Sequence, residues 1–203
     1  MRTQKRIQAN IDLDAIAYNL DSMRKNLKKD TQIIAVLKAD GYGHGAVPLA
    51  KEIEAYPYIW GIAVATVEEG MELRSAGIQK PILILGYTYE EDYDRIVRED
   101  FRPTVFKISM AKKLSEAAKR AGKTLKIHIK IDTGMTRIGY RNPEIDIPEI
   151  LEICRLPGLE AEGIFTHFAR ADETELDPAS RQFERFTVFL KGLEAAGVTF
   201  PIK

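Results

Sequence analysis

With 203 residues and 45% hydrophobic content, the chain is long enough to bury one sizeable core, which favours a single domain. Its 30 Lys and Arg residues balance its 30 Asp and Glu residues, and a net charge of zero excludes the global basic field that draws proteins to nucleic acid or anionic membranes. The first residues lack the apolar stretch of an export signal, and no window approaches the roughly 20 apolar residues that cross a bilayer, so we expect a cytoplasmic protein.

Short apolar runs alternate with amphipathic stretches along the chain. Six runs are predicted to be strands, at residues 33–37, 59–65, 81–85, 103–106, 125–131 and 159–166. Several are continuous Val, Ile and Leu runs, which are typical of parallel strands covered on both faces. Before them, residues 6–13 alternate as a strand does.

Capping signals mark helices between the strands. Three helices have start and stop residues, namely Thr66 and Gly77, Ser109 and Gly122, and Asp177 and Gly197. Thr66 with Glu69 three residues later has the spacing of a capping box, and Pro178 stands where proline favours the first turn of a helix.

The repeated strand and helix units predict an α/β protein of the (β/α)8 TIM-type barrel class rather than an open doubly wound sheet. Such a barrel needs eight strands and typically about 250 residues. The chain offers six units and, in residues 198–203, the start of a seventh strand. We therefore expect residues 1–203 to form one incomplete barrel domain, truncated after about six units. Its open edge strands predict a homo-oligomer.

The stretch AVLKADGYGHGA, residues 35–46, places Lys38 at the carboxyl end of the first predicted strand. Barrel enzymes hold their catalytic groups at this end. Burial there favours the neutral amine, a nucleophile that forms Schiff bases with aldehydes such as pyridoxal phosphate. The alternative is a lysine that extends its amine into solvent. The glycines that follow permit positive φ, and the Tyr42 phenol suits a phosphate.

The fifth predicted strand alternates isoleucines with His128, Lys130 and Asp132. Buried charges are costly unless they are paired, so this face is predicted to line a polar site, with an ion-pair network as the alternative. Arg137 follows in a glycine-flanked loop and suits a phenolic oxygen or a carboxylate, although a surface arginine is equally compatible with the pattern. His167, at the end of the sixth strand, is by its residue context alone a core histidine.

Three segments carry a family resemblance. AVLKADGYGHG, KIDTGMTRIG and THFARAD, at three predicted strand ends, resemble the motifs of alanine racemases. These are pyridoxal-phosphate-dependent isomerases with an N-terminal barrel and a C-terminal β domain, and the resemblance runs through essentially the whole chain. It implies a dimer that supplies D-alanine for the cell wall, and a C-terminal β domain that is absent from these 203 residues.

The resemblance also implies roles for five residues. Lys38 would hold the cofactor and act as the base on one face of the amino acid, and Tyr42 would contact the cofactor phosphate. Arg137 would contact the ring oxygen and the substrate carboxylate, and Lys130, carbamylated, would orient Arg137. His167 would belong to the polar network beneath the cofactor. No metal is implied.

In this family, a second acid–base group comes from the partner subunit, so the resemblance implies little racemisation by these residues alone. Three alternatives remain at this stage. The first is a single-domain pyridoxal-phosphate-binding homeostasis protein of the same barrel class. The second is a racemase that acts on serine or another amino acid, and the third is a chain that no longer binds the cofactor.

Overall fold

The computed structural model describes residues 8–203, which form one parallel sheet with helices around it. The six strands are β1 (Ile33–Val36), β2 (Ile59–Val64), β3 (Ile82–Ile84), β4 (Phe101–Val105), β5 (Leu125–Lys130) and β6 (Leu159–Phe165). Every neighbouring pair is parallel, and the order in the sheet follows the order in the chain. All six predicted strands are therefore confirmed, with ends displaced by two residues at most.

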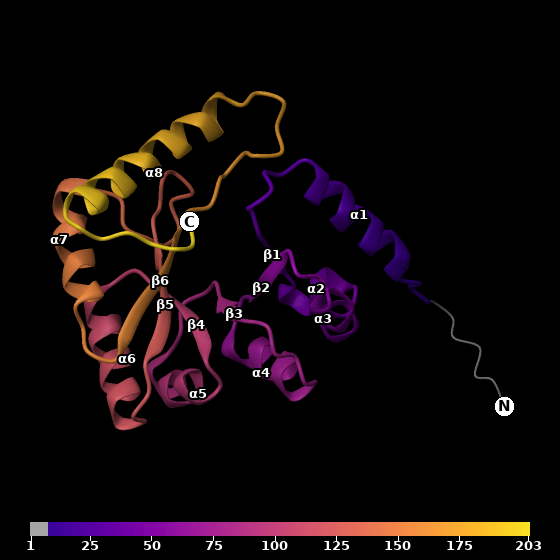
Figure 1. Ribbon diagram of the computed structural model, residues 1–203, viewed down its shortest axis with the longest axis horizontal. Coiled ribbons are helices and arrows are strands. Elements are labelled where there is room, and N and C mark those ends of the chain that lie inside the picture. The colour runs from indigo at the N-terminus through magenta and orange to yellow at the C-terminus, as the bar shows by residue number, and fades with distance from the viewer. Residues whose placement is uncertain (1–7) are drawn as a thin grey trace.

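Helices precede β1 and follow each strand. They are α1 (Leu13–Lys25), α2 (Lys38–Gly43), α3 (Ala46–Glu54), α4 (Val67–Ser75), α5 (Tyr93–Arg98), α6 (Ile108–Arg120), α7 (Pro143–Cys154) and α8 (Asp177–Ala195), with a 3-10 turn η1 (Glu90–Asp92) before α5. Figure 1 shows the strands at the centre of the molecule and the helices round their outside. No helix among residues 8–203 is both long and apolar enough to cross a membrane.

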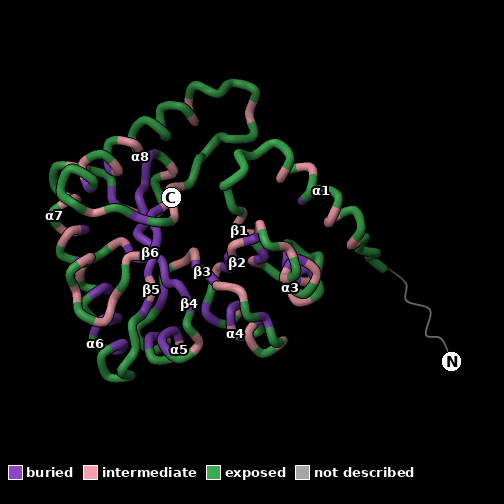
Figure 2. Tube along the Cα trace, in the orientation of Figure 1, coloured by how far each residue is buried: buried purple, intermediate pink, exposed green. Residues whose placement is uncertain are grey.

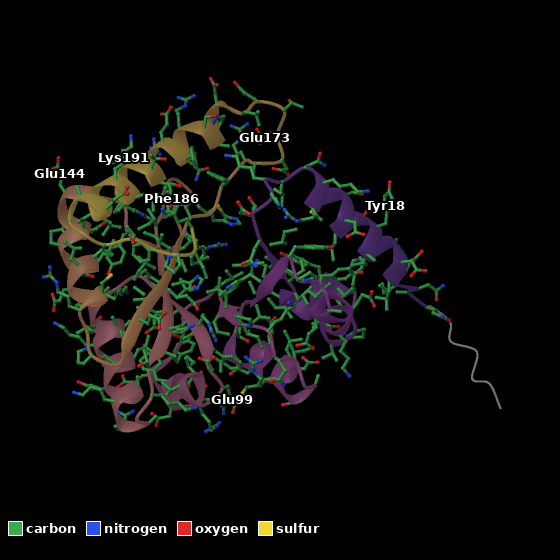
Figure 3. All side chains as sticks on the ribbon, in the orientation of Figure 1. Tyr18, Glu99, Glu144, Glu173, Phe186 and Lys191 are labelled. Atoms are coloured by element: carbon green, nitrogen blue, oxygen red, sulfur yellow. The ribbon has the colours of Figure 1, made fainter. Side chains whose placement is uncertain are left out.

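The core lies between the sheet and the helices that cover it. Ile127 and Ile129 of β5 are fully buried, and so is Ile164 of β6. Figure 2 shows burial concentrated on the strands and exposure on the outer helix surfaces. In Figure 3, Phe186 of α8 lies on the side of the helix toward β6, whereas Lys191 of the same helix points outward. Strands such as β4 are buried on both faces, as the continuous apolar runs predict, whereas the helices bury one face only.

Two of the displaced boundaries have local reasons. β4 begins at Phe101 rather than at Pro103, so a proline lies inside a central strand. Proline has no N–H to donate to the ladder, and the Thr104 hydroxyl instead donates to the Ile84 carbonyl at 2.6 Å. Helix α6 begins one residue before Ser109, because the Glu149 carboxylate accepts the first helical amide, 2.9 Å away.

The two ends of the sheet differ. The outer side of β6 is already paired by Ile202, which donates to the Glu162 carbonyl and accepts from the Ile164 amide, as expected of a beginning strand. Within residues 8–203, β1 pairs only with β2. Of the predicted strand at residues 6–13, residues 6 and 7 lie outside the described residues, and residues 8–12 have no regular structure before α1 begins.

Candidate active site

A cavity of about 500 Å³ opens where the carboxyl ends of the strands meet. Parallel strands bring these ends to one edge of the sheet, so loops from distant parts of the sequence reach the same space. Much of the wall is apolar and comes from Ile34, Ala63, Leu83, Leu85, Ile164 and Phe165. The volume lies in the range of sites for small molecules.

All five residues that the sequence singles out line this cavity: Lys38, Tyr42, Lys130, Arg137 and His167. They come from the loops and strand ends of β1, β5 and β6, so the tertiary structure brings three distant motifs together. Two further residues line the cavity: His128, from the face of β5 that was predicted to be polar, and Tyr87, which was not predicted. No signal marks Tyr87 in the sequence, since a single aromatic residue after a strand is common.

Lys38 lies just after β1 and immediately before a left-handed turn. Residues 39–42 have φ between 53° and 61°, so α2 is a left-handed turn. This conformation costs a residue with a side chain roughly 1–2 kcal/mol, and three of these four residues have one. The Asp40 carboxylate stabilises the turn by accepting the Ala46 amide at 2.7 Å. Addition of a Cβ to Gly41 would bring it 2.9 Å from Leu49.

The Lys38 side chain is half-buried and lies against the cavity wall. Its Nζ is 5.9 Å from the ring centroid of Tyr42, which is itself 60% exposed. The amine of Lys38 and the phenol of Tyr42 therefore border one end of the cavity and are accessible to a ligand.

The predicted capping box at the start of α4 is only half right. The Thr66 hydroxyl accepts the Glu69 amide at 3.3 Å, as predicted. The Glu69 carboxylate does not return to Thr66 and instead accepts the amides of Ala39, at 2.8 Å, and Ala65, at 2.7 Å. Both amides lie just beyond strand ends, where the sheet ladder no longer supplies acceptors.

The polar face of β5 serves two purposes. His128 and Lys130 line the cavity, as predicted. Asp132 does not, because its carboxylate accepts the amides of Thr136, at 2.9 Å, and Arg137, at 3.1 Å. Burial alone raises the pKa of Asp132, but these and other hydrogen bonds outweigh it and hold the pKa below its ordinary value. Asp132 thus shapes the loop that presents Arg137.

The cations around the cavity repel one another. Burial lowers the pKa of Lys130 to about 8. The positive charge of Arg137 also lowers this pKa, whereas the negative charge of Asp132 raises it. The Lys130 ammonium donates to the Ile131 carbonyl at 2.6 Å. Burial also lowers the pKa of His167, reinforced by the charges of Arg137, Lys130 and Lys38, so this imidazole is neutral at pH 7.

These positive charges have few local partners. Within residues 8–203, the Arg137 side chain makes no hydrogen bond or ion pair, and no acidic residue lines the cavity in the described part of the chain. Unpaired charges near a low-dielectric wall are costly. An anionic ligand would supply the missing negative charge.

The sheet and the cavity together define a barrel-type α/β domain with a cation-lined site at the carboxyl ends of its strands. A family model described as the N-terminal domain of alanine racemase matches residues 11–203. The chain therefore belongs to the alanine racemase N-terminal domain family, and the predicted fold class is confirmed.

Individual relatives agree with this assignment. Alanine racemase 2 of Caldanaerobacter subterraneus subsp. tengcongensis is 44% identical over 97% of this chain and 50% of its own length. Alanine racemase of Desulforamulus reducens is 42% identical over 97% of this chain and 53% of its own length. An alanine racemase structure from Clostridium difficile 630, in complex with cycloserine, superposes with a TM-score of 0.91 at 41% identity, covering 94% of this chain and 52% of that one. The chain spans about half the length of the curated relatives it matches.

Proposed function

We propose that this chain supplies the cofactor-holding part of the active site of a pyridoxal-phosphate-dependent racemase that interconverts L- and D-alanine. The observation that carries the proposal is the excess of positive charge around the cavity, from Lys38, Lys130 and Arg137, with no acidic residue among the described lining residues. Relatives named alanine racemase match 97% of the chain, which supports alanine over serine or another amino acid.

Pyridoxal phosphate fits the site in size and charge. The Lys38 amine would hold its aldehyde carbon covalently, the Tyr42 phenol would donate to its phosphate, and Arg137 would pair with its ring oxygen. When bound, the pyridine ring withdraws electrons from the α-carbon of an attached amino acid. Apolar walls, including Leu83 and Ile164, would exclude water from the reacting atoms.

The residues of this chain would then divide the work. Besides holding the cofactor, Lys38 would take the α-proton from one face of the substrate or return it there. Arg137 pairs with the substrate carboxylate and so orients the α-carbon toward the Lys38 amine. His167, which is neutral at pH 7, offers a hydrogen bond without adding another positive charge to the site.

Lys130 is proposed to carry a carbamate. Because its pKa is lowered to about 8, a sizeable fraction of the amine is neutral near pH 7.5, and the neutral amine is the form that adds CO2 and releases a proton. The product is an anion, which turns the repulsion between Lys130 and Arg137 into attraction. Mass spectrometry of the native protein in bicarbonate buffer should show the mass of one added CO2, and an unmodified Lys130 would contradict the idea.

The central test is covalent capture of the cofactor. Purified protein is mixed with pyridoxal phosphate, the visible absorbance is recorded, and borohydride is added to fix any link to lysine. We expect an absorbance band and a modified peptide that contains Lys38, both abolished in Lys38→Ala. Lys51→Ala, an exposed lysine on α3 outside the cavity, is the matched control and should behave as the unmutated chain. Equal labelling of both variants would contradict the proposal.

The proposal extends to the whole protein. We propose that a second acid–base group acts on the opposite face of the substrate from the partner subunit of a dimer, with a C-terminal β domain, and that the product serves cell-wall synthesis. The names of the relatives support only the alanine racemisation in this extension. The dimer, the β domain and the cell-wall role rest on the family resemblance. Residues 1–203 alone should then racemise alanine only weakly, whereas an ordinary enzymatic rate would contradict it. A homeostasis protein that only binds the cofactor would show capture at Lys38 but no racemisation in the full-length dimer.

A further inference from the structure

Outside the cavity, one carboxylate holds the backbone of two cavity walls together. The oxygens of Glu69 accept two amides, Oε1 that of Ala39 at 2.8 Å and Oε2 that of Ala65 at 2.7 Å. Ala39 directly follows Lys38 at the end of β1, and Ala65 follows the end of β2 and lines the cavity. Glu69 itself is half-buried in the first turns of α4 and does not line the cavity.

The amide of Ala39 donates to Glu69 at the start of a strained turn. Ala39 is the first left-handed residue of α2, with φ of 53°, and it is exposed to solvent. A strained backbone persists only where its surroundings hold it. Within residues 8–203, Glu69 is the acceptor that the structure provides for the Ala39 amide, whereas Asp40 holds the far end of the turn through Ala46.

We propose that Glu69 is a positioning residue for Lys38. By holding the Ala39 amide, its carboxylate fixes the direction in which the chain leaves β1, and by holding the Ala65 amide it ties that direction to the neighbouring strand. The cavity-facing direction of the Lys38 amine follows from both contacts. This inference rests on the proposed function only in treating Lys38 as the residue that captures the cofactor.

The proposal makes a specific substitution informative. Glu69→Gln preserves size and shape but leaves one carbonyl oxygen and one NH2 group, so one of the two amides must face a donor. A hydrogen bond to a charged acceptor is strong enough that its loss changes an equilibrium by roughly tenfold or more. Glu72→Gln is the matched control, because Glu72 lies on the same helix, is exposed, and has no side-chain hydrogen bond among residues 8–203.

The experiment measures two quantities on the same proteins. Amide hydrogen exchange of the cofactor-free chain reports on the turn, with the core amide of Ile129 as the reference for global folding. Borohydride capture of pyridoxal phosphate reports on Lys38. For Glu69→Gln we expect exchange at Ala39 about tenfold faster and capture at Lys38 about tenfold slower, with Ile129 unchanged. Glu72→Gln should change none of the three.

The outcomes separate this inference from the proposed function. Unchanged Ala39 exchange or unchanged Lys38 capture in Glu69→Gln would overturn the positioning role. If the unmutated chain captures no cofactor, the proposed function fails, and Ala39 exchange alone decides whether Glu69 holds the turn. If Glu69→Gln does not fold, amide exchange in the unmutated chain is the test. Protection of the Ala39 amide supports the positioning role of Glu69, and exchange at the rate of an unprotected amide refutes it.

Discussion

Two clusters of charge lie along the sheet of this protein, and they are organised in opposite ways. Toward the amino ends of the strands, Glu162 is surrounded by Arg102, Lys126 and His128, at 3.2, 3.1 and 3.2 Å. Toward the carboxyl ends, Lys130 and its neighbours surround the cavity without an acidic partner on the lining. The same strand, β5, contributes to both clusters.

The difference distinguishes structural charge from functional charge. Burial alone would raise the pKa of Glu162, but Lys126, Arg102 and His128 outweigh burial and hold it below its ordinary value. That carboxylate is therefore ionised and satisfied within the fold. Lys130 has the opposite balance, since its pKa is lowered and its charge is only partly compensated. Ionisable groups with strongly shifted pKa values cluster at functional sites, where a ligand or a modification can neutralise the uncompensated charge.

The largest expected effect comes from breaking the paired cluster. Glu162→Gln removes the buried carboxylate that Arg102, Lys126 and His128 share. Arg102 keeps its ion pair with Asp100, and Lys126 is 38% exposed, so we expect a loss near the lower end of the about 3–5 kcal/mol that removal of one partner of a buried ion pair costs. Denaturant unfolding should show this loss in the free energy of unfolding. Glu160→Gln, an exposed residue on the same strand, is the control. A loss no larger than that of the control would remove the distinction between the clusters.

Removal of the unpaired charge should act in the opposite direction. Lys130→Met is expected to stabilise the cofactor-free protein at pH 7, in bicarbonate-free buffer, by on the order of 1–3 kcal/mol, because it removes a buried cation. Thermal or denaturant unfolding measures this gain. A destabilised variant would mean that Lys130 is held by interactions stronger than the repulsion from Arg137.

The same residue predicts a pH dependence. The pKa of Lys130 is about 8 in the folded chain and 10.5 in its ordinary state, so between these values the unfolded chain binds more protons. The free energy of unfolding attributable to Lys130 therefore rises with pH across this window and is lowest below pH 8. Comparison of the unmutated chain with Lys130→Met from pH 7 to 10 isolates the contribution, and identical pH profiles would contradict it.

At Arg137 we expect an effect on ligand binding that is smaller than the stability effects at Glu162 and Lys130. Arg137→Gln should weaken binding of pyridoxal phosphate or inorganic phosphate about tenfold, because one charged hydrogen-bonding group is lost from the cavity. Its unfolding free energy should hardly change, since the side chain is exposed. Arg155→Gln, at the end of α7 and away from the cavity, should leave binding unchanged. Calorimetric titration compares the two variants, and equal affinities would rule out Arg137 as a ligand contact.

The smallest effect is expected for a pair of charges outside both clusters. Lys112 and Glu152 form an ion pair at 2.8 Å, and both side chains are 53% exposed. Solvent screens such pairs, so Lys112→Gln should leave the unfolding curve unchanged within error. A clear shift would show that the exposure of a charged pair does not indicate how much the pair contributes to the free energy of unfolding.

Much of the fold was predictable because local apolar patterns and strand burial coincide. Continuous apolar runs such as Ile59–Val64 are typical of strands that are buried on both faces, and this run is such a strand. The start of β4 was predicted too late because proline usually marks a strand boundary, whereas in the fold Pro103 lies inside the strand and the neighbouring Thr104 hydroxyl donates to the Ile84 carbonyl. The five predicted site residues all reach the cavity, because each lies at or beyond a strand end and parallel strands align those ends.

The AVLKADGYGHGA segment shows where local pattern is insufficient. Its glycines at positions 41, 43 and 45 do have positive φ, as their chemistry permits. The left-handed state of Ala39 and Tyr42 follows from no local preference, because their side chains disfavour it. The amide of Ala39, where this turn begins, donates to the carboxylate of Glu69, 30 residues away along the chain, and the local pattern assigns Glu69 to a helix cap.

Residue chemistry and spacing set the strand and helix order, the barrel class, and the three motifs that carry Lys38, Lys130 and His167, because these properties depend on neighbours a few positions apart. Tertiary structure decided which charges are neutralised and which remain available. It joins Glu162 to three cations and leaves the cavity without an acidic residue among its described lining residues, because only folding brings groups from different strands within reach of one another.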